Sequence, residues 1–113
     1  MKWIRVTEIR NIPVRQGRAV RLGSLELAIF NLGGAFRAVE SRCPHKQGPL
    51  ADGIVAGDDI ICPLHNWRLS LDSGFVKAPA DHVESCVKTY PCRAEQGFIL
   101  VAIPEEALCE EAA

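Results

Sequence analysis

Two short segments, each with one cysteine and one histidine, constrain this chain more than any other feature of its sequence. Cys43 is followed two positions later by His45, and Cys62 is followed three positions later by His65. Thiolate sulfur and imidazole nitrogen are common protein ligands of zinc and of iron–sulfur clusters. Since sixteen residues separate His45 from Cys62, we expect a fold that brings two loops together around one metal centre.

The sulfur and nitrogen ligands fit two kinds of metal centre. A tetrahedral zinc site normally pairs cysteine with cysteine and histidine with histidine, two to four residues apart, so the mixed pairs and the single residue between Cys43 and His45 are unusual for it. In a [2Fe-2S] cluster held by two cysteines on one iron and two histidines on the other, each loop sends one ligand to each iron. The mixed pairs therefore favour the cluster over zinc.

Eight residues of these loops resemble the Rieske family: Cys43, Pro44, His45, Gly48, Cys62, Pro63, His65 and Trp67. We predict that Cys43, His45, Cys62 and His65 are the metal ligands. Proline after each cysteine fixes the backbone angle φ and stiffens the loop. Gly48 is expected to allow a close backbone approach to the cluster, and Trp67 is expected to pack over the second loop.

The ligand charges predict how such a cluster behaves. An oxidised [2Fe-2S] core with two thiolates and two neutral imidazoles has no net charge, so it accepts an electron more readily than an all-cysteine site. Its potential falls in a range of roughly -150 to +300 mV. Membrane-bound quinol-oxidising members of the family have hydroxyl side chains where this chain has Trp67 and Leu69. The resemblance therefore implies a low-potential, ferredoxin-like centre.

The composition limits what else the chain can be. Its 113 residues suffice for one domain, and a formal net charge of -1 marks no nucleic-acid or membrane binder. The charged start has no apolar core segment, and the apolar run from Phe98 to Ile103 is too short to cross a bilayer. We expect a cytoplasmic protein. Five cysteines without an export signal argue against a disulfide framework, so Cys86, Cys92 and Cys109 are expected to be ordinary thiols.

Short β-prone segments separated by turn residues predict an all-β fold, a small Rieske-like sandwich or barrel with the two cluster-binding loops at one end. We predict strands at 3–9, 25–30, 35–40, 54–55, 60–61, 67–71, 75–77, 86–93 and 98–103, with weak alternation at 18–22. Alternation of Leu25, Leu27 and Ile29 with their neighbours predicts a strand buried on one face. Residues 1–103 form the predicted domain, and 104–113 form an acidic tail that begins like a short helix.

From about Ile12 to Val101 the chain resembles the small subunit of the NAD(P)H-dependent assimilatory nitrite reductase. The more discriminating pieces are Asn66 beside Trp67 and the segment Cys86-Val87-Lys88-Thr89-Tyr90-Pro91. The resemblance implies a non-catalytic electron-transfer subunit beside a large partner that carries FAD, siroheme and a [4Fe-4S] cluster and reduces nitrite to ammonium. This chain has no dinucleotide-binding glycine fingerprint and no predicted catalytic residue.

Two alternatives to this function remain open on the sequence alone. The runner-up is the Rieske ferredoxin of an aromatic-ring dioxygenase system, in which glycine is usual at the position of Asn66. A zinc-binding interaction module is a distant third.

His82, in Asp81-His82-Val83-Glu84, is interpreted as part of a surface loop. Cys86 and Cys92 are predicted to lie on one face of a strand and to serve packing.

Overall fold

The fold is described by a computed structural model that covers residues 2–42, 49–63, 66–78 and 86–104. Within those residues every strand pairing is antiparallel. The elements in chain order are β1 (Lys2–Glu8), the 3-10 helix η1 (Ile9–Asn11), β2 (Gly17–Leu22), β3 (Leu25–Asn31), β4 (Phe36–Glu40), the 3-10 helix η2 (Leu50–Asp52), β5 (Ile54–Ala56), β6 (Asp59–Ile61), β7 (Arg68–Ser70), β8 (Val76–Ala78), β9 (Thr89–Tyr90), β10 (Cys92–Glu95) and β11 (Phe98–Ile103). The all-β prediction is confirmed.

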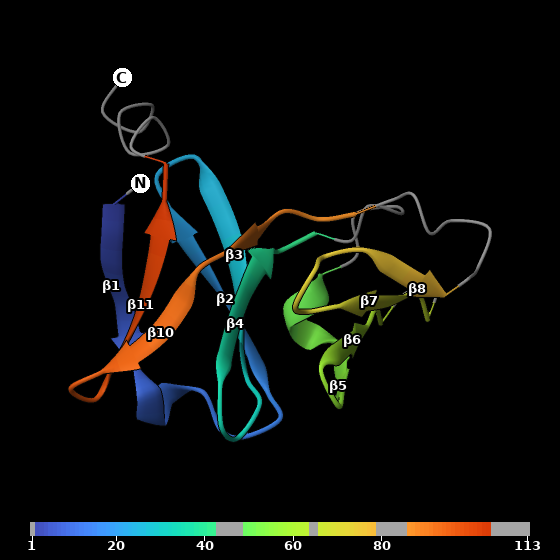
Figure 1. Ribbon diagram of the computed structural model, residues 1–113, viewed down its shortest axis with the longest axis horizontal. Helices are drawn as coiled ribbons and strands as arrows, with labels where there is room; N and C mark the ends of the chain where they lie inside the picture. The colour runs from blue at the N-terminus through green and yellow to red at the C-terminus, as the bar shows by residue number, and fades with distance from the viewer. Residues whose placement is uncertain (1, 43–48, 64–65, 79–85, 105–113) are drawn as a thin grey trace.

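The strands form three sheets. Their strand orders are β1-β11-β10, β2-β3-β4-β9 and β5-β6-β7-β8. In Figure 1 the first sheet stands beside the second on the left, and the β5–β8 sheet stands on the other side of β4. The second sheet is therefore the central one. We call the β5–β8 sheet the small sheet, because each of its strands has three residues.

Each face of the central sheet contributes to a separate hydrophobic core. The first core joins Ala28, Phe30 and Val39 of the central sheet to Ile60, Leu69 and Val76 of the small sheet. The second core joins Leu27, Ile29, Ala38 and Tyr90 of the central sheet to Ile99, Val101 and Ile103 of β11. The prediction that the strand at 25–30 is buried on one face is therefore wrong. Both faces of β3 are covered, because Ala28 and Phe30 are as apolar as the residues that alternate with them.

The strand predicted at 86–93 is also wrong in its extent. Cys86 makes only an isolated bridge with Phe75, and β9 covers only Thr89 and Tyr90. Pro91 separates β9 from β10, and these two strands belong to different sheets. Proline has no N–H to donate to a ladder, so pairing with one sheet stops there and the chain passes to the next.

Several of the hairpins turn at a glycine with positive φ. Gly33, in the turn between β3 and β4, has φ +94, and Gly74, in the turn between β7 and β8, has φ +83. A Cβ atom at Gly74 would overlap the carbonyl oxygen of Val87. The Val87 N–H donates to the Gly74 carbonyl at 2.9 Å. Glycine at this position therefore lets the small sheet lie against the segment that leads into β9.

The predicted tail, apart from Pro104, lies outside the described residues, as do His82 and Cys109. In the described part of the chain we find no helical segment with the length and apolar character that crossing a bilayer requires.

Candidate metal centre

The first predicted ligand loop leaves β4 and returns at η2, and its two ends are paired. Arg42 and Pro49 form an antiparallel bridge, and the Leu50 N–H donates to the Ser41 carbonyl at 2.9 Å. Ser41 is in turn tied to β3, because its hydroxyl donates to the Glu26 carboxylate at 2.6 Å. This hydrogen bond outweighs partial burial and, with Arg42 nearby, lowers the pKa of Glu26.

The second predicted ligand loop connects β6 to β7 and is closed by two backbone hydrogen bonds. The Cys62 N–H donates to the Trp67 carbonyl at 2.7 Å, and the Asn66 N–H donates to the Cys62 carbonyl at 3.1 Å. Asn66 has φ +58, in the left-handed region that asparagine and glycine tolerate best. The conformation of this turn therefore explains why asparagine stands before Trp67.

The two loop stems are anchored in the same core. Leu50, at the end of the first stem, is fully buried, as is Cys62 at the start of the second. Trp67 is 8% exposed and packs in the first core with both of them. Because one packed core holds both stems, the positions at which the two loops begin and end are fixed relative to each other.

An ion cluster braces the strands that carry the second loop. Asp59 on β6 has only 7% of its side chain exposed, and it accepts a hydrogen bond from Arg68 Nε at 2.7 Å. Lys77 Nζ on β8 donates to both oxygens of Asp59, at 3.2 and 3.0 Å. Burial opposes ionisation of Asp59, but these hydrogen bonds and the two positive charges outweigh it and lower its pKa.

The predicted site residues are only partly within the described chain. Cys62, Pro63 and Trp67 are described, whereas Cys43, Pro44, His45, Gly48 and His65 lie outside the described residues. The four-ligand set therefore stays a prediction. Cys62 is buried and directly follows β6, which contains the strand predicted at 60–61. Pro63 beside it is exposed, and Trp67 packs at the base of its loop.

Sequence reasoning missed Glu26 and Asp59, the two carboxylates that brace the loop stems. Both precede the loops by several residues and face cations from other strands, so only the strand register reveals them. In sequence, Asp59 stands out solely as a charged residue beside the apolar pair Ile60-Ile61.

The described residues fit an iron–sulfur group. Cys62 is a fully buried thiol that is in no disulfide, and the backbone on both sides of it is hydrogen-bonded. A thiolate placed there requires a positively charged partner, because an uncompensated buried charge is costly. Soft sulfur donors suit an iron–sulfur cluster or zinc.

The remaining described cysteines are not arranged as predicted. Cys86 is exposed, whereas Cys92 lies partly buried in β10 against the second core. Cys86 lies outside the named strands and bridges only to Phe75, whereas Cys92 belongs to β10. The two cysteines therefore do not lie on one face of one strand, and that prediction is wrong. Burial raises the pKa of Cys92 to about 12, although the positive charge of Arg37 opposes the shift. The Cys92 thiol is therefore a packing group at neutral pH.

The fold and the loop stems together define a class of protein. It is the class of small antiparallel β domains in which a loop held between two strands carries a buried cysteine that suits a metal group. Residues 2–91 match the Rieske [2Fe-2S] domain, and the chain belongs to that family. It is a Rieske-type electron-transfer protein that binds a [2Fe-2S] cluster.

Named relatives come from several redox systems. The chain is 33% identical over 107 residues to the 3-phenylpropionate/cinnamic acid dioxygenase ferredoxin subunit of Escherichia coli K12, which covers 93% of this chain and 97% of that protein. It is 30% identical to the 4beta-methylsterol monooxygenase of Methylococcus capsulatus over 96% of this chain, but it spans only 31% of that longer protein.

Two solved structures illustrate the shared fold. The Sphingomonas yanoikuyae B1 ferredoxin superposes with a TM-score of 0.80 at 26% identity, over 91% of this chain and all of that one. A structure described as the small subunit of an NADPH nitrite reductase superposes with a TM-score of 0.77 over 91% of this chain and all of that one. At 18% identity the latter shows the likeness of fold alone.

Proposed function

We propose that this chain is the electron-transfer small subunit of an NAD(P)H-dependent nitrite reductase in the cytoplasm. Cys43, His45, Cys62 and His65 hold its [2Fe-2S] cluster, residues 1–103 form the domain, and 104–113 form an acidic tail. FAD, siroheme and the [4Fe-4S] cluster belong to the large partner subunit. The bound cluster supplies one-electron transfer, and the residues of this chain hold and orient it.

The observation that carries the proposal is the resemblance of two short segments to that small subunit, Asn66 with Trp67 and the run from Cys86 to Pro91. Both coincide with points where the fold makes special demands. Asn66 takes the left-handed turn that closes the second loop. Pro91 lies where the chain changes from the central sheet to the β1-β11-β10 sheet, which we call the outer sheet. The fold match to a nitrite reductase small subunit is compatible with the proposal.

A second candidate is the ferredoxin of an aromatic-ring dioxygenase system. It is favoured by the named relatives, such as the naphthalene 1,2-dioxygenase ferredoxin component of Pseudomonas aeruginosa, 30% identical over 88% of this chain. The left-handed φ of Asn66 weakens one distinction between the candidates, because glycine and asparagine both fit that conformation. The segment from Cys86 to Pro91 then carries more of the assignment.

The test is reconstitution with a partner of each kind. The iron-loaded chain is mixed with a siroheme-containing large reductase subunit from its own genome, and NAD(P)H oxidation, ammonium formation and complex formation by size-exclusion chromatography are measured. In parallel it is mixed with an aromatic-ring oxygenase and its reductase. We expect a complex with the large subunit and a rise in nitrite-dependent NAD(P)H oxidation.

Support for the oxygenase reaction without any complex with the large subunit would refute the proposal in favour of the second candidate. Metal analysis addresses the remaining alternative. A colourless protein with one zinc and no acid-labile sulfide would indicate an interaction module instead.

A further inference from the structure

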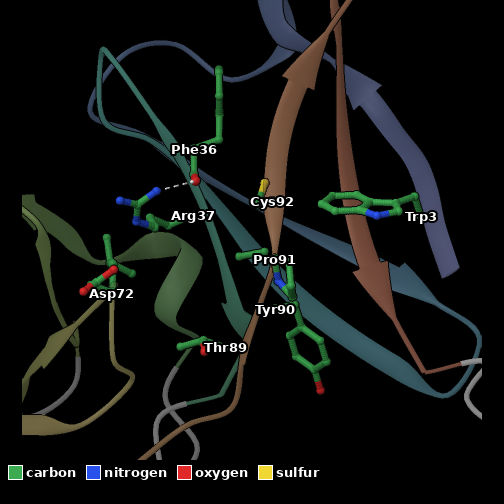
Figure 2. A pocket seen from close by; sticks show the side chains of 10 residues that line it. Trp3, Phe36, Arg37, Asp72, Thr89, Tyr90, Pro91 and Cys92 are labelled. Carbon is green, nitrogen blue, oxygen red and sulfur yellow. Dashed lines mark hydrogen bonds between the residues drawn. The ribbon is translucent and has the colours of Figure 1, made fainter. Parts of the chain in front are cut away.

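A groove of about 400 Å³ lies where the outer sheet, the central sheet and the turn between β7 and β8 meet. Its walls include Trp3 of β1, Arg37 of β4, Asp72 of the β7–β8 turn and Cys92 of β10. In Figure 2, Trp3 lies on one side of Cys92, and Arg37 and Asp72 lie on the other. None of the described residues of the two ligand-loop stems lines this groove.

The groove exists because two strands separate there. β4 pairs with β9 through Ala38 and Val39 only, so Phe36 and Arg37 have no strand partner on that side. After Pro91 the chain continues as β10, which pairs with β11 in the other sheet. The edges of β4 and β10 therefore diverge and leave the side chain of Arg37 along the opening.

Arg37 keeps unused hydrogen-bonding capacity in this groove. One terminal nitrogen, NH1, donates to the Phe36 carbonyl at 3.1 Å, as the dashed line in Figure 2 marks. Its Nε is buried and has no hydrogen-bond partner among the described residues. Asp72 lines the same groove but forms no ion pair with Arg37. A buried N–H without an acceptor is costly, so a carboxylate that pairs with it is favoured.

The rim of the groove has the composition of a binding surface. Trp3 is one of four exposed large apolar side chains among the described residues, with 40% of its surface accessible. The guanidinium of Arg93 lies over its ring at 4.2 Å, and Arg93 also pairs with Glu95 at 3.3 Å. Tryptophan and arginine are the side chains most often found at the energetic centres of protein interfaces.

We propose that this groove is a docking site for an acidic side chain on a surface loop of the large redox subunit. The partner's carboxylate pairs with Arg37 through Nε and the second terminal nitrogen, after a rotation of the guanidinium group, while Trp3 and Arg93 pack on the flanking surface. This inference rests on the proposed function, because it takes the large subunit as the partner.

The location gives this docking a distinct role. The groove is built mainly on the outer and central sheets, whereas the ligand loops extend from β4, η2, β6 and β7. A partner held at the groove leaves the loop stems uncovered, so anchoring and electron exchange use different surfaces of the same domain. Asp72 places a negative charge beside the incoming carboxylate, and it therefore limits the affinity of the complex.

The test measures the affinity of the iron-loaded chain for the large subunit by biolayer interferometry. We expect Arg37→Gln and Arg93→Gln each to weaken binding, Arg37→Gln by about tenfold or more. Asp72→Asn is expected to tighten binding by about two- to fivefold, because it removes a like charge. Arg18→Gln, an exposed residue of β2 with the same change in charge, is the matched control and is expected to change binding by less than about twofold.

Folding of each variant is checked by its cluster spectrum and its melting temperature. Arg37→Gln is expected to keep both, because it removes one hydrogen bond, from NH1 to the neighbouring Phe36 carbonyl, and Nε has no partner among the described residues. If the parent binds the large subunit but Arg37→Gln and Arg18→Gln bind equally well, the docking site is refuted and the proposed function stands. A weaker complex for Asp72→Asn would also refute it, because Asp72 would then contact a cation. If the parent does not bind the large subunit at all, the proposed function fails.

Discussion

Replacing Asp59 by asparagine tests whether the ion cluster braces the second loop. The substitution keeps the shape of the side chain and removes the charge that accepts hydrogen bonds from Arg68 and Lys77. Hydrogen bonds to charged groups contribute about 1.5 to 3 kcal/mol each. Arg68 and Lys77 are 42% and 55% exposed and can turn to water, which reduces the loss. We expect a loss of about 2 kcal/mol in the free energy of unfolding.

The assay is urea unfolding of parent and variant, each compared at the same pH. In a thermal unfolding experiment, a loss of this size corresponds to a melting temperature lower by about 8 °C. The pKa of Asp59 is lower in the folded protein than its ordinary value of 3.8. The stabilisation is therefore complete above about pH 3.8 and is lost as the pH falls through the folded-state pKa. The difference between parent and variant is expected to stay constant from pH 7 to 5 and to shrink in stronger acid.

Asp58→Asn is the matched control, because Asp58 is the exposed neighbour and its side chain forms no ion pair with any residue that the structure describes. It is expected to change the unfolding free energy by less than about 0.5 kcal/mol. Equal stability of the parent and Asp59→Asn at pH 7, or an equal loss in Asp58→Asn, would refute the bracing role of Asp59.

Three further predictions concern the glycine turn, the thiols and the cluster. Gly74→Ala should lower the unfolding free energy by about 2 to 4 kcal/mol, because φ is positive and the new methyl group meets the carbonyl of Val87. Chemical denaturation measures this loss, and an unchanged midpoint would contradict the packing described. In native protein at pH 8 a thiol reagent should label Cys86 within seconds to minutes and Cys92 only on unfolding. With a pKa of about 12, only about one Cys92 thiol in ten thousand is ionised at that pH. Equal labelling rates would show that Cys92 is not buried as described. Cys62→Ser should abolish the visible absorption of the cluster, and Cys92→Ser should leave it intact; a coloured Cys62→Ser variant would remove that residue from the ligand set. The midpoint potential of the parent should lie below about +150 mV.

The sequence was sufficient for the strands whose turns are marked by glycine. The strands predicted at 25–30, 35–40, 60–61, 67–71 and 75–77 follow from local residue chemistry. The structure confirms a strand in each of these ranges, with Gly33 and Gly74 in the turns of two hairpins. It was insufficient for β3, because alternation distinguishes the two faces of a strand only when one of them is polar. The apolar residues on both faces of β3 left the second core invisible until the sheets were placed.

The split at Pro91 shows a second limit. Pro91 lies inside the strand predicted at 86–93, and a single sequence does not reveal that the chain changes sheets there. The groove at Arg37 was missed for a related reason. Its walls come from residues that are far apart in the chain, such as Trp3 and Asp72, and none of them belongs to a recognisable motif.

The two-sided burial of β3 has a consequence for engineering. A fragment cut to contain only the small sheet would leave the Ala28 and Phe30 face behind and expose its own apolar residues to water. Grafting the two predicted ligand loops onto another scaffold therefore requires that β3 and β4 be transferred with them, because these strands cover the apolar face of the small sheet. For the same reason, we expect the three sheets to unfold together in a single cooperative transition.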